Sequence, residues 1–343
     1  MTDLSTIQGS QSCAASSAAD FSAAPLTDSA GTAQTVADLF SSGRSGEATA
    51  MLNTAREGQP QAVQDALDRM VSARLDQSLN PSPTLGTQQF FATPADIGCT
   101  IRRVNDAGNN PPATPDTTGL SDAQKYDVYS SIVDVRGNAA AQDALANGDR
   151  VILGLRNENV TTVNNGQGTY DDRLVVLARD ADGTVHVNEF NRASTEPTAQ
   201  YDANQSSNPN VTFRRGDGVD ITDDGVGELG RIAEGTMELF ETTHRNPASA
   251  GSNFSLRPTA DAVAAAPAGV QRDSNHDGLF TAADPGGSVA LNDTFKIHSG
   301  SRTNTDSAGC TTLHPNDYAS FRTAVTADAN QDRWQYVLTH TAP

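Results

Sequence analysis

The segment DDRLVVLARDADGTVHVNEF, residues 171–190, decides the fold class of the second half of the chain. Two apolar runs at 174–178 and 185–190 flank Asp-Ala-Asp-Gly, an arrangement that predicts two strands joined by a tight turn. The upstream run RVILGLR, residues 150–156, predicts a further strand. Additional strands are expected at residues 211–214, 236–240, 295–298 and 334–339. We therefore expect residues 149–343 to form a mostly β domain.

Upstream of this domain the apolar spacing is helical. Between residues 33 and 82 apolar side chains recur three and four positions apart, which predicts two or three short amphipathic helices. The stretch NNPPATPDTTG, residues 109–119, predicts a linker, and Ser121 is placed to cap a following helix. The expected fold class is α+β. Its expected parts are a disordered leader (1–32), a small helical region (33–82), a linker with helices (83–148) and the β-rich domain (149–343).

The charge balance bears on partners and location. The chain has 42 acidic and 23 basic residues, a formal net charge of -19, which opposes binding to nucleic acid or to anionic lipid surfaces. No stretch of 18 apolar residues occurs, so no membrane span is expected. The N-terminal residues lack a basic region followed by an apolar run, so export by the general secretory route is not expected.

The catalytic residues are expected in the segment TFKIHSGSRTNTDSAGCTTLHPNDYASF, residues 294–321. The three cysteines, Cys13, Cys99 and Cys310, are too few and too widely spaced for a disulfide framework, which leaves a reactive thiol as an alternative. A strand that ends at residue 297 delivers His298, and Ser-Ala-Gly then precedes Cys310. An imidazole beside a thiol can produce the thiolate, and a preceding glycine can orient backbone N–H groups toward an oxyanion.

This segment resembles the signature of the L,D-transpeptidase (YkuD-like) family. The matching residues are His298, Ser307, Gly309 and Cys310, with Asn-Asp at 316–317 echoing the end of the motif. The stretch GRIAEGTMEL, residues 230–239, resembles an earlier turn and strand of the family. The sequence departs from the family at Ser299, Ala308 and Thr312 and in the length of the loop before the cysteine. The resemblance assigns catalysis to Cys310, His298, Gly309 and Ser307, and substrate contacts to Arg302, Thr312 and Asn316.

The resemblance implies a mostly β L,D-transpeptidase-like catalytic domain acting on peptidoglycan stem peptides. Cys310 would attack the substrate carbonyl, and His298 would serve as base and then as acid. His314 is an alternative base if residues 310–314 are helical. Export by a non-Sec route would make the protein an antibacterial effector, cytoplasmic before export and then secreted or periplasmic, with a secretion-machinery or immunity partner. The alternatives are a calcium-stabilised, non-catalytic module of a cell surface or virion, and a cysteine hydrolase or amidase with another peptide substrate.

A second motif, DSNHDGLFTAAD at residues 273–284, matches an EF-hand-type calcium loop. Its oxygen donors alternate, a glycine stands at the sixth position, and an aspartate replaces the usual final glutamate. Because its flanks are poor helix formers, we expect an isolated loop with a structural calcium ion. A weaker relative begins at Asp220, includes Thr222, Asp224 and Glu228, and is not expected to bind calcium on its own. The expected ligands of the stronger loop are Asp273, Asn275, Asp277, Leu279, Thr281 and Asp284.

Overall fold

The computed structural model describes residues 28–77, 93–205, 209–244, 254–284, 286, 288–292 and 294–342. The chain forms two compact units, Met1–Gly108 and Asn109–Pro343, which are described separately. Expectations for most of the leader, including Cys13, and for residues 78–92 fall outside the described residues. Among the helices that are described, none has both the length and the apolar character needed to cross a membrane. Mixed helix and strand, expected from the sequence, is confirmed.

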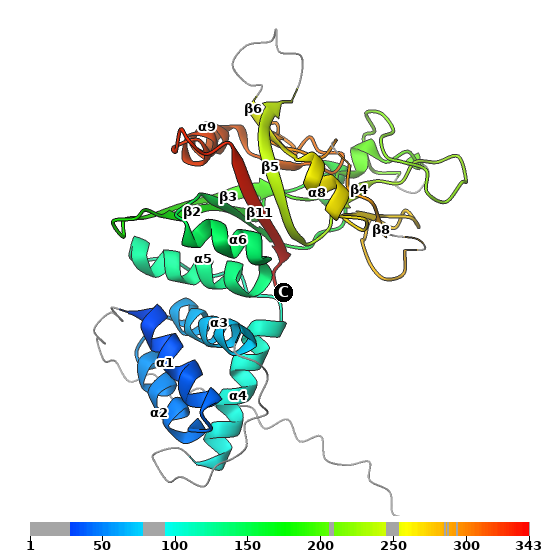
Figure 1. Cartoon of the computed structure of the whole chain (residues 1–343). Helices are drawn as coiled ribbons and strands as arrows, with labels where there is room; N and C mark the ends of the chain where they lie inside the picture. The colour runs from blue at the N-terminus through cyan, green and yellow to red at the C-terminus, as the bar shows by residue number, and fades with distance from the viewer. Residues whose placement is uncertain are drawn as a thin grey trace, which may run out of the picture. The chain divides into compact units, whose positions relative to one another are not determined.

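Helices make up the described part of the first unit (Figure 1). They are α1 (Ser29–Ser41), α2 (Ser45–Arg56), α3 (Gln61–Gln77) and α4 (Pro94–Asn109). The Asp28 side chain caps α1 by accepting a hydrogen bond from the Gly31 N–H at 2.7 Å. The apolar residues predicted from the helical spacing meet in one core, which includes Val36, Phe40, Leu52, Leu67 and Met70, and Val104 of α4 adds to it.

Two features of this unit lie outside the apolar pattern. The Asp68 carboxylate is buried and binds the guanidinium groups of Arg56 and Arg103. Burial raises the pKa of Asp68, although the two cations oppose that effect. Cys99 lies in α4 and is disulfide-bonded. One disulfide is not a framework, so this bond leaves the prediction that the three cysteines form no disulfide framework in place.

The second unit is built on a closed eight-stranded barrel with the strand order β1-β11-β5-β6-β9-β10-β3-β2. The pairs β1 with β11 and β9 with β10 are parallel, and the other neighbouring strands are antiparallel. The barrel strands are β1 (Val151–Arg156), β2 (Asp172–Arg179), β3 (Val185–Ser194), β5 (Gly235–Thr243), β6 (Phe254–Pro258), β9 (Ile297–Ser299), β10 (Thr311–Leu313) and β11 (Arg333–His340).

Helices cover both faces of the sheet around β1, β2 and β11 (Figure 1). On one face lie α5 (Asp122–Arg136), whose start is held by a capping box of Ser121 and Gln124, and α6 (Ala139–Ala146). On the other face, Phe321 of α9 (Pro315–Val325) packs against Phe190 at 5.5 Å between ring centroids. Every residue of β1 is buried, which explains its continuous apolar run.

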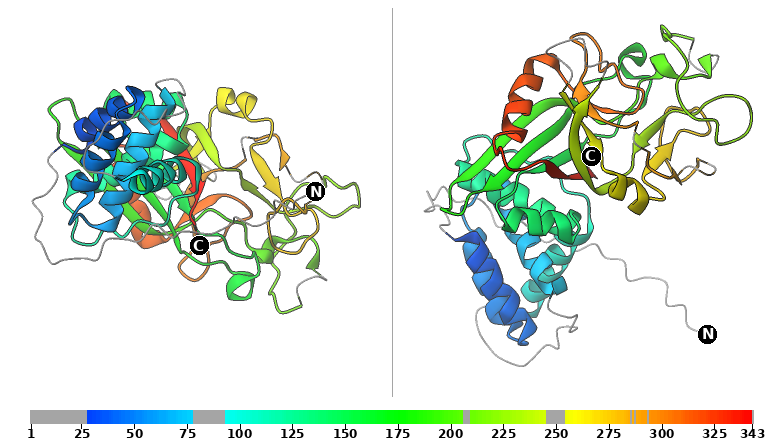
Figure 2. Two further views of the ribbon diagram at one scale, coloured as in Figure 1. Left: turned by 90° about the horizontal axis from the view of Figure 1, so that it is seen from below. Right: turned by 45° about the horizontal axis from the view of Figure 1, so that its top comes forward.

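A small sheet, β4-β7-β8, lies on the opposite side of this unit from α5 and α6 (Figure 2). Its strands are β4 (Gly230–Ile232), β7 (Val270–Arg272) and β8 (Ser288–Val289). The remaining short helices are α7 (Val163–Gly166), η1 (Ala199–Tyr201) and α8 (Ala260–Ala265). The strand expected at 211–214 is wrong, since these residues are not in a strand and residues 212 and 214 are exposed.

Candidate functional site

Cys310 lies directly before β10, at the barrel strand pair β9–β10. Its thiol is free and partly buried, and Sγ lies 3.9 Å from the Thr294 carbonyl oxygen. Burial raises the pKa of the thiol to about 11, although the backbone and charge of Lys296 oppose this shift. In this state Cys310 is a protonated thiol at neutral pH.

His298 lies on the neighbouring strand β9 and is 5% exposed. Its Nδ1 lies 2.8 Å from the Ser299 carbonyl oxygen, a contact in which Nδ1–H is the donor and the Nε2 lone pair is left as the basic position. Burial, followed by the charge of the neighbouring His244, lowers the pKa of His298 to about 3. The imidazole is therefore neutral at pH 7.

The parallel pairing of β9 with β10 relates the two groups. Ile297 is opposite Thr311 and His298 is opposite Thr312, so Cys310 lies two residues before the partner of His298. Side chains two residues apart on a strand point to the same face. Within the described residues, however, no hydrogen bond joins Cys310 to His298. The structure brings the two predicted residues to adjacent strands but shows no thiolate–imidazolium pair.

Ser307 and Gly309 shape the turn that presents the thiol. The Ser307 hydroxyl donates to the Cys310 carbonyl at 2.7 Å and accepts from the Gly309 N–H at 3.0 Å. Gly309 has φ +138°, and a Cβ atom there would lie 2.1 Å from the Gly230 carbonyl oxygen. The two segments singled out by the family resemblance are therefore in contact. The Gly309 N–H, one of the backbone groups predicted to stabilise an oxyanion, is therefore already bonded to the Ser307 hydroxyl.

The alternative base His314 is placed at the other end of β10. Residues 311–313 form a strand, so Cys310 and His314 are separated by about 13 Å of extended chain and share no helical face. His314 instead caps α9, where Nδ1 accepts from the Asn316 N–H at 3.2 Å, and its ring packs edge-on against Tyr170. These contacts give His314 a structural role.

The predicted substrate-binding residues are not gathered in one place. Arg302 is exposed in the loop before Cys310, and Asn316 is exposed in the first turn of α9. Thr312 is completely buried, so its side chain cannot touch a substrate in this state. Asn316 follows the strand end that lies away from Cys310, so only Arg302 shares the loop of the thiol.

Sequence reasoning missed His244, which directly follows β5. Its ring stacks on that of His298 with 3.8 Å between centroids and an interplanar angle of 16°. The Lys296 Nζ lies 3.5 Å from the His244 carbonyl oxygen, which brings a cation to the same place. No motif links residue 244 to residue 298; only the pairing of β6 with β9 and with β5 places them together.

A buried charged network near the end of β1 was also missed. The Arg156 guanidinium, fully buried, donates to the Thr195 hydroxyl at 2.8 Å and to the Ile232 carbonyl at 2.8 Å. Glu196 accepts from Arg231 at 2.8 Å, and burial, then the charge of Asp172, raises the pKa of Glu196 to about 8. These residues are scattered along the chain, so their spacing carries no signal.

The predicted calcium loop folds around its own carboxylates. Asp273 accepts hydrogen bonds from the N–H groups of Asp277 and Gly278 at 3.0 and 2.9 Å, and Asp284 accepts from those of Ser274 and Thr281 at 2.9 and 2.7 Å. Gly278 has φ +84°, as the sharp turn requires. Burial, then the charges of nearby carboxylates, raises the pKa of Asp273 to about 6. Among the described residues, no Lys or Arg forms an ion pair with the carboxylates of this loop, and these carboxylates are not among the acidic groups whose oxygens lie within 4.8 Å of one another.

The weaker loop has the same local pattern. Asp220 accepts from the N–H groups of Asp224 and Gly225 at 3.2 and 2.8 Å, matching the bonds of Asp273. Among the described residues, Asp220, Asp224 and Glu228 can bring ligand oxygens within 4.8 Å of one another. The Glu228 oxygens are already bound by Ile221 N–H and the Thr222 hydroxyl. The acidic oxygens therefore lie closer together in the loop that begins at Asp220, which was predicted to be the weaker site, than in loop 273–284.

Comparisons with family models, with curated proteins and with solved structures find no match to this chain.

Proposed function

We propose that the second unit is a cysteine-dependent acyl transferase whose nucleophile is Cys310. Within that class, we assign it to L,D-transpeptidase-like enzymes acting on peptidoglycan stem peptides, as a transpeptidase or a carboxypeptidase. The observation that carries the proposal is the placement of His298 on β9 and of Cys310 directly before the paired strand β10, in a turn where Gly309 leaves no room for a Cβ atom. The contact of this turn with Gly230 adds support, because both segments bear the family resemblance.

The proposed reaction begins with two neutral groups. The Cys310 thiol transfers its proton to His298 Nε2 as sulfur attacks the substrate carbonyl carbon, because the Ser299 carbonyl keeps the Nδ1 proton in place. His298 then gives that proton to the departing amine, which is D-alanine in the family reaction, as the C–N bond breaks. The remaining thioester passes its acyl group to an amine, which forms a crosslink, or to water. Transfer of the proton requires the thiol and the imidazole to come within hydrogen-bond distance when substrate binds.

A non-catalytic, calcium-stabilised surface or virion module is the second candidate, and one observation favours it. The thiol has a pKa raised to about 11 and the imidazole a pKa lowered to about 3, so transfer of a proton from the thiol to the imidazole is strongly unfavourable in this state. In an acyl transferase, the pKa values of the thiol and the imidazole must move closer together when substrate enters and replaces water or moves the thiol. An inert module would leave them unchanged.

We propose further that loop 273–284 holds a structural calcium ion and that the protein acts outside the cytoplasm. The carboxylates of Asp273 and Asp284 are buried without a cationic partner among the described residues, which a divalent cation would neutralise. The disulfide at Cys99 supports an oxidising location, since such bonds persist mainly outside the cytosol. Action as an exported effector, with secretion-machinery or immunity partners, belongs to this same proposal.

The test is incubation of wild type, Cys310→Ala, His298→Gln and His314→Gln with purified muropeptides, followed by mass spectrometry. We expect wild type and His314→Gln to remove or exchange the terminal residue or to form crosslinks, and the other two to be inactive. His314→Gln is the matched control because it removes an imidazole from the other end of β10. Activity that survives in Cys310→Ala would refute the nucleophile. Inactivity of all four proteins on muropeptides, with cleavage of another peptide by wild type, would favour a different cysteine hydrolase.

A further inference from the structure

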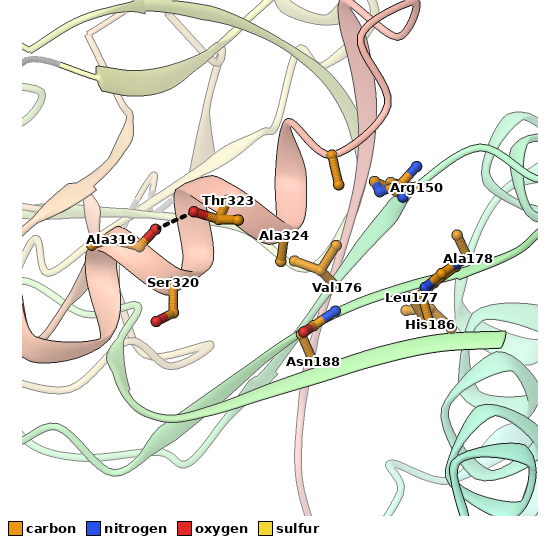
Figure 3. A pocket seen from close by; sticks show the side chains of 11 residues that line it. Arg150, Val176, Leu177, Ala178, His186, Asn188, Ala319, Ser320, Thr323 and Ala324 are labelled. Atoms are coloured by element: carbon orange, nitrogen blue, oxygen red, sulfur yellow. Dashed lines mark hydrogen bonds between the residues drawn. The ribbon is translucent and has the colours of Figure 1, made fainter.

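A pocket of about 480 Å³ lies between the β2–β3 hairpin and helix α9, and no residue of the Cys310 turn lines it (Figure 3). On the strand side, Val176 is opposite Asn188 and Ala178 is opposite His186, so these side chains share one face of the sheet. The helix side is formed by small residues of α9. Its volume falls within the range of small-molecule sites. The helix-side residues, with one from the following loop, are Ala319, Ser320, Thr323, Ala324 and Ala327.

Arg150 is the unusual member of this pocket. Only 9% of the residue is exposed, and its guanidinium makes no hydrogen bond or ion pair with any residue that the structure describes. Its backbone is held in place, because the Gln331 side chain accepts from the Arg150 N–H at 2.8 Å and donates to the Arg150 carbonyl at 2.9 Å. The aliphatic part of this side chain is therefore covered, whereas its guanidinium nitrogens are not among the fully buried polar atoms and can be reached from solvent. In a chain with 42 acidic residues, leaving this arginine unpaired points to an anionic ligand.

The rest of the lining limits the chemistry of that ligand. Thr323 Oγ1 donates to the Ala319 carbonyl at 3.1 Å, so its hydroxyl hydrogen is already used. One ring nitrogen of His186 is likewise bound to Asp180, at 2.7 Å. Asn188 supplies an amide, and the methyl groups of the alanine residues supply small apolar surface. Among the described lining residues, Arg150 is the only lysine or arginine, whereas a phosphate dianion would favour a second cation.

We propose that this pocket binds the carboxylate of a small aliphatic acid or of a short peptide with a free C-terminus, with Arg150 as its anchor. The planar guanidinium matches a carboxylate in a two-point contact. The neighbouring methyl groups accommodate alanine-sized side chains, and Asn188 is placed to bond a peptide group.

The test is isothermal titration of the full chain with N-acetyl-alanylalanine, with the same compound as its C-terminal amide, and with inorganic phosphate. We expect the acid to bind and the amide to bind at least about ten-fold more weakly. Arg150→Gln should weaken binding of the acid by about 10- to 100-fold, as expected for the loss of a charge-assisted contact. Arg102→Gln, which removes an exposed arginine of α4, should leave binding unchanged.

Ala319→Leu provides a variant that keeps Arg150 and fills the pocket from the exposed side of α9, where leucine is well tolerated. It should abolish binding while circular dichroism shows a folded protein. Equal binding of the acid and the amide, unchanged binding in Arg150→Gln or Ala319→Leu, or binding of phosphate but not of the acid would each overturn the proposal. Absence of binding by wild type to any of the three compounds would overturn it as well.

Discussion

The reactivity of Cys310 toward iodoacetamide should rise steadily with pH without levelling off near neutrality. Only the thiolate is alkylated, and burial raises the pKa of this thiol from 9.0 to about 11. A shift of two units lowers the thiolate fraction at pH 7.5 about 100-fold relative to an unperturbed cysteine. The native protein should therefore show a ten-fold increase in rate for each pH unit between about 7 and 9.5.

The assay is timed alkylation followed by mass spectrometry of the peptide that contains Cys310, so the other cysteines do not contribute. The urea-unfolded chain is the reference, and its rate should be half-maximal near pH 9 and level off above about pH 10. His298→Gln should leave the native profile unchanged, because no hydrogen bond joins the imidazole to the thiol in this state. A plateau below pH 8 in the native protein would show a preformed thiolate and refute the reasoning. A plateau that appears only when muropeptide is present would instead support activation by substrate.

Three further changes test other parts of the second unit. Glu196→Gln should flatten the pH dependence of the free energy of unfolding measured in urea. The folded-state pKa of Glu196, about 8, lies above the unfolded value, so the wild type loses a few kcal/mol of stability as pH rises from about 4.5 to 8. An unchanged slope in the variant would contradict this. Calcium should raise the melting temperature of wild type, and Asp273→Asn should reduce that increase, whereas an equal increase in both would place the ion elsewhere. Gly309→Ala should destabilise the unit by more than about 1 kcal/mol through its clash with the Gly230 carbonyl and should lower muropeptide turnover; a variant as stable as wild type would show that the turn can move.

Many of the strands were predictable because apolar runs and the turn-forming residues that bound them are local features of the sequence. The hairpin of β2 and β3, the run of β1 and the terminal strand β11 all follow from apolar runs bounded by turns. The strand predicted at residues 211–214 was wrong because a short segment of mixed polarity forms a strand only if another strand pairs with it. Barrel closure was not predictable, since the pairing of β1 with β11 joins residues at opposite ends of the unit.

The sequence could predict which residues belong to the candidate site but not how they are arranged in space. The motif located Cys310, Gly309 and His298, and the requirement for glycine is explained by the nearby Gly230 carbonyl. It could not show that Thr312 is buried, that His244 stacks on His298, or that the thiol lacks a bond to the imidazole. Those features depend on which strands become neighbours and on how much water remains around each group.

The position of β11 in the barrel constrains the synthesis of the protein. Ile152 pairs with Tyr336, so roughly 180 residues separate the two partners, and β11 stands between β1 and β5. At about 5–20 residues per second, a ribosome needs on the order of 10–40 s to produce the partner of a strand that is already complete. During that time an apolar strand that is buried on both faces in the folded protein has no native neighbour on that side. Nascent chains of this protein should therefore depend on chaperones that shield such strands until the last of them leaves the ribosome.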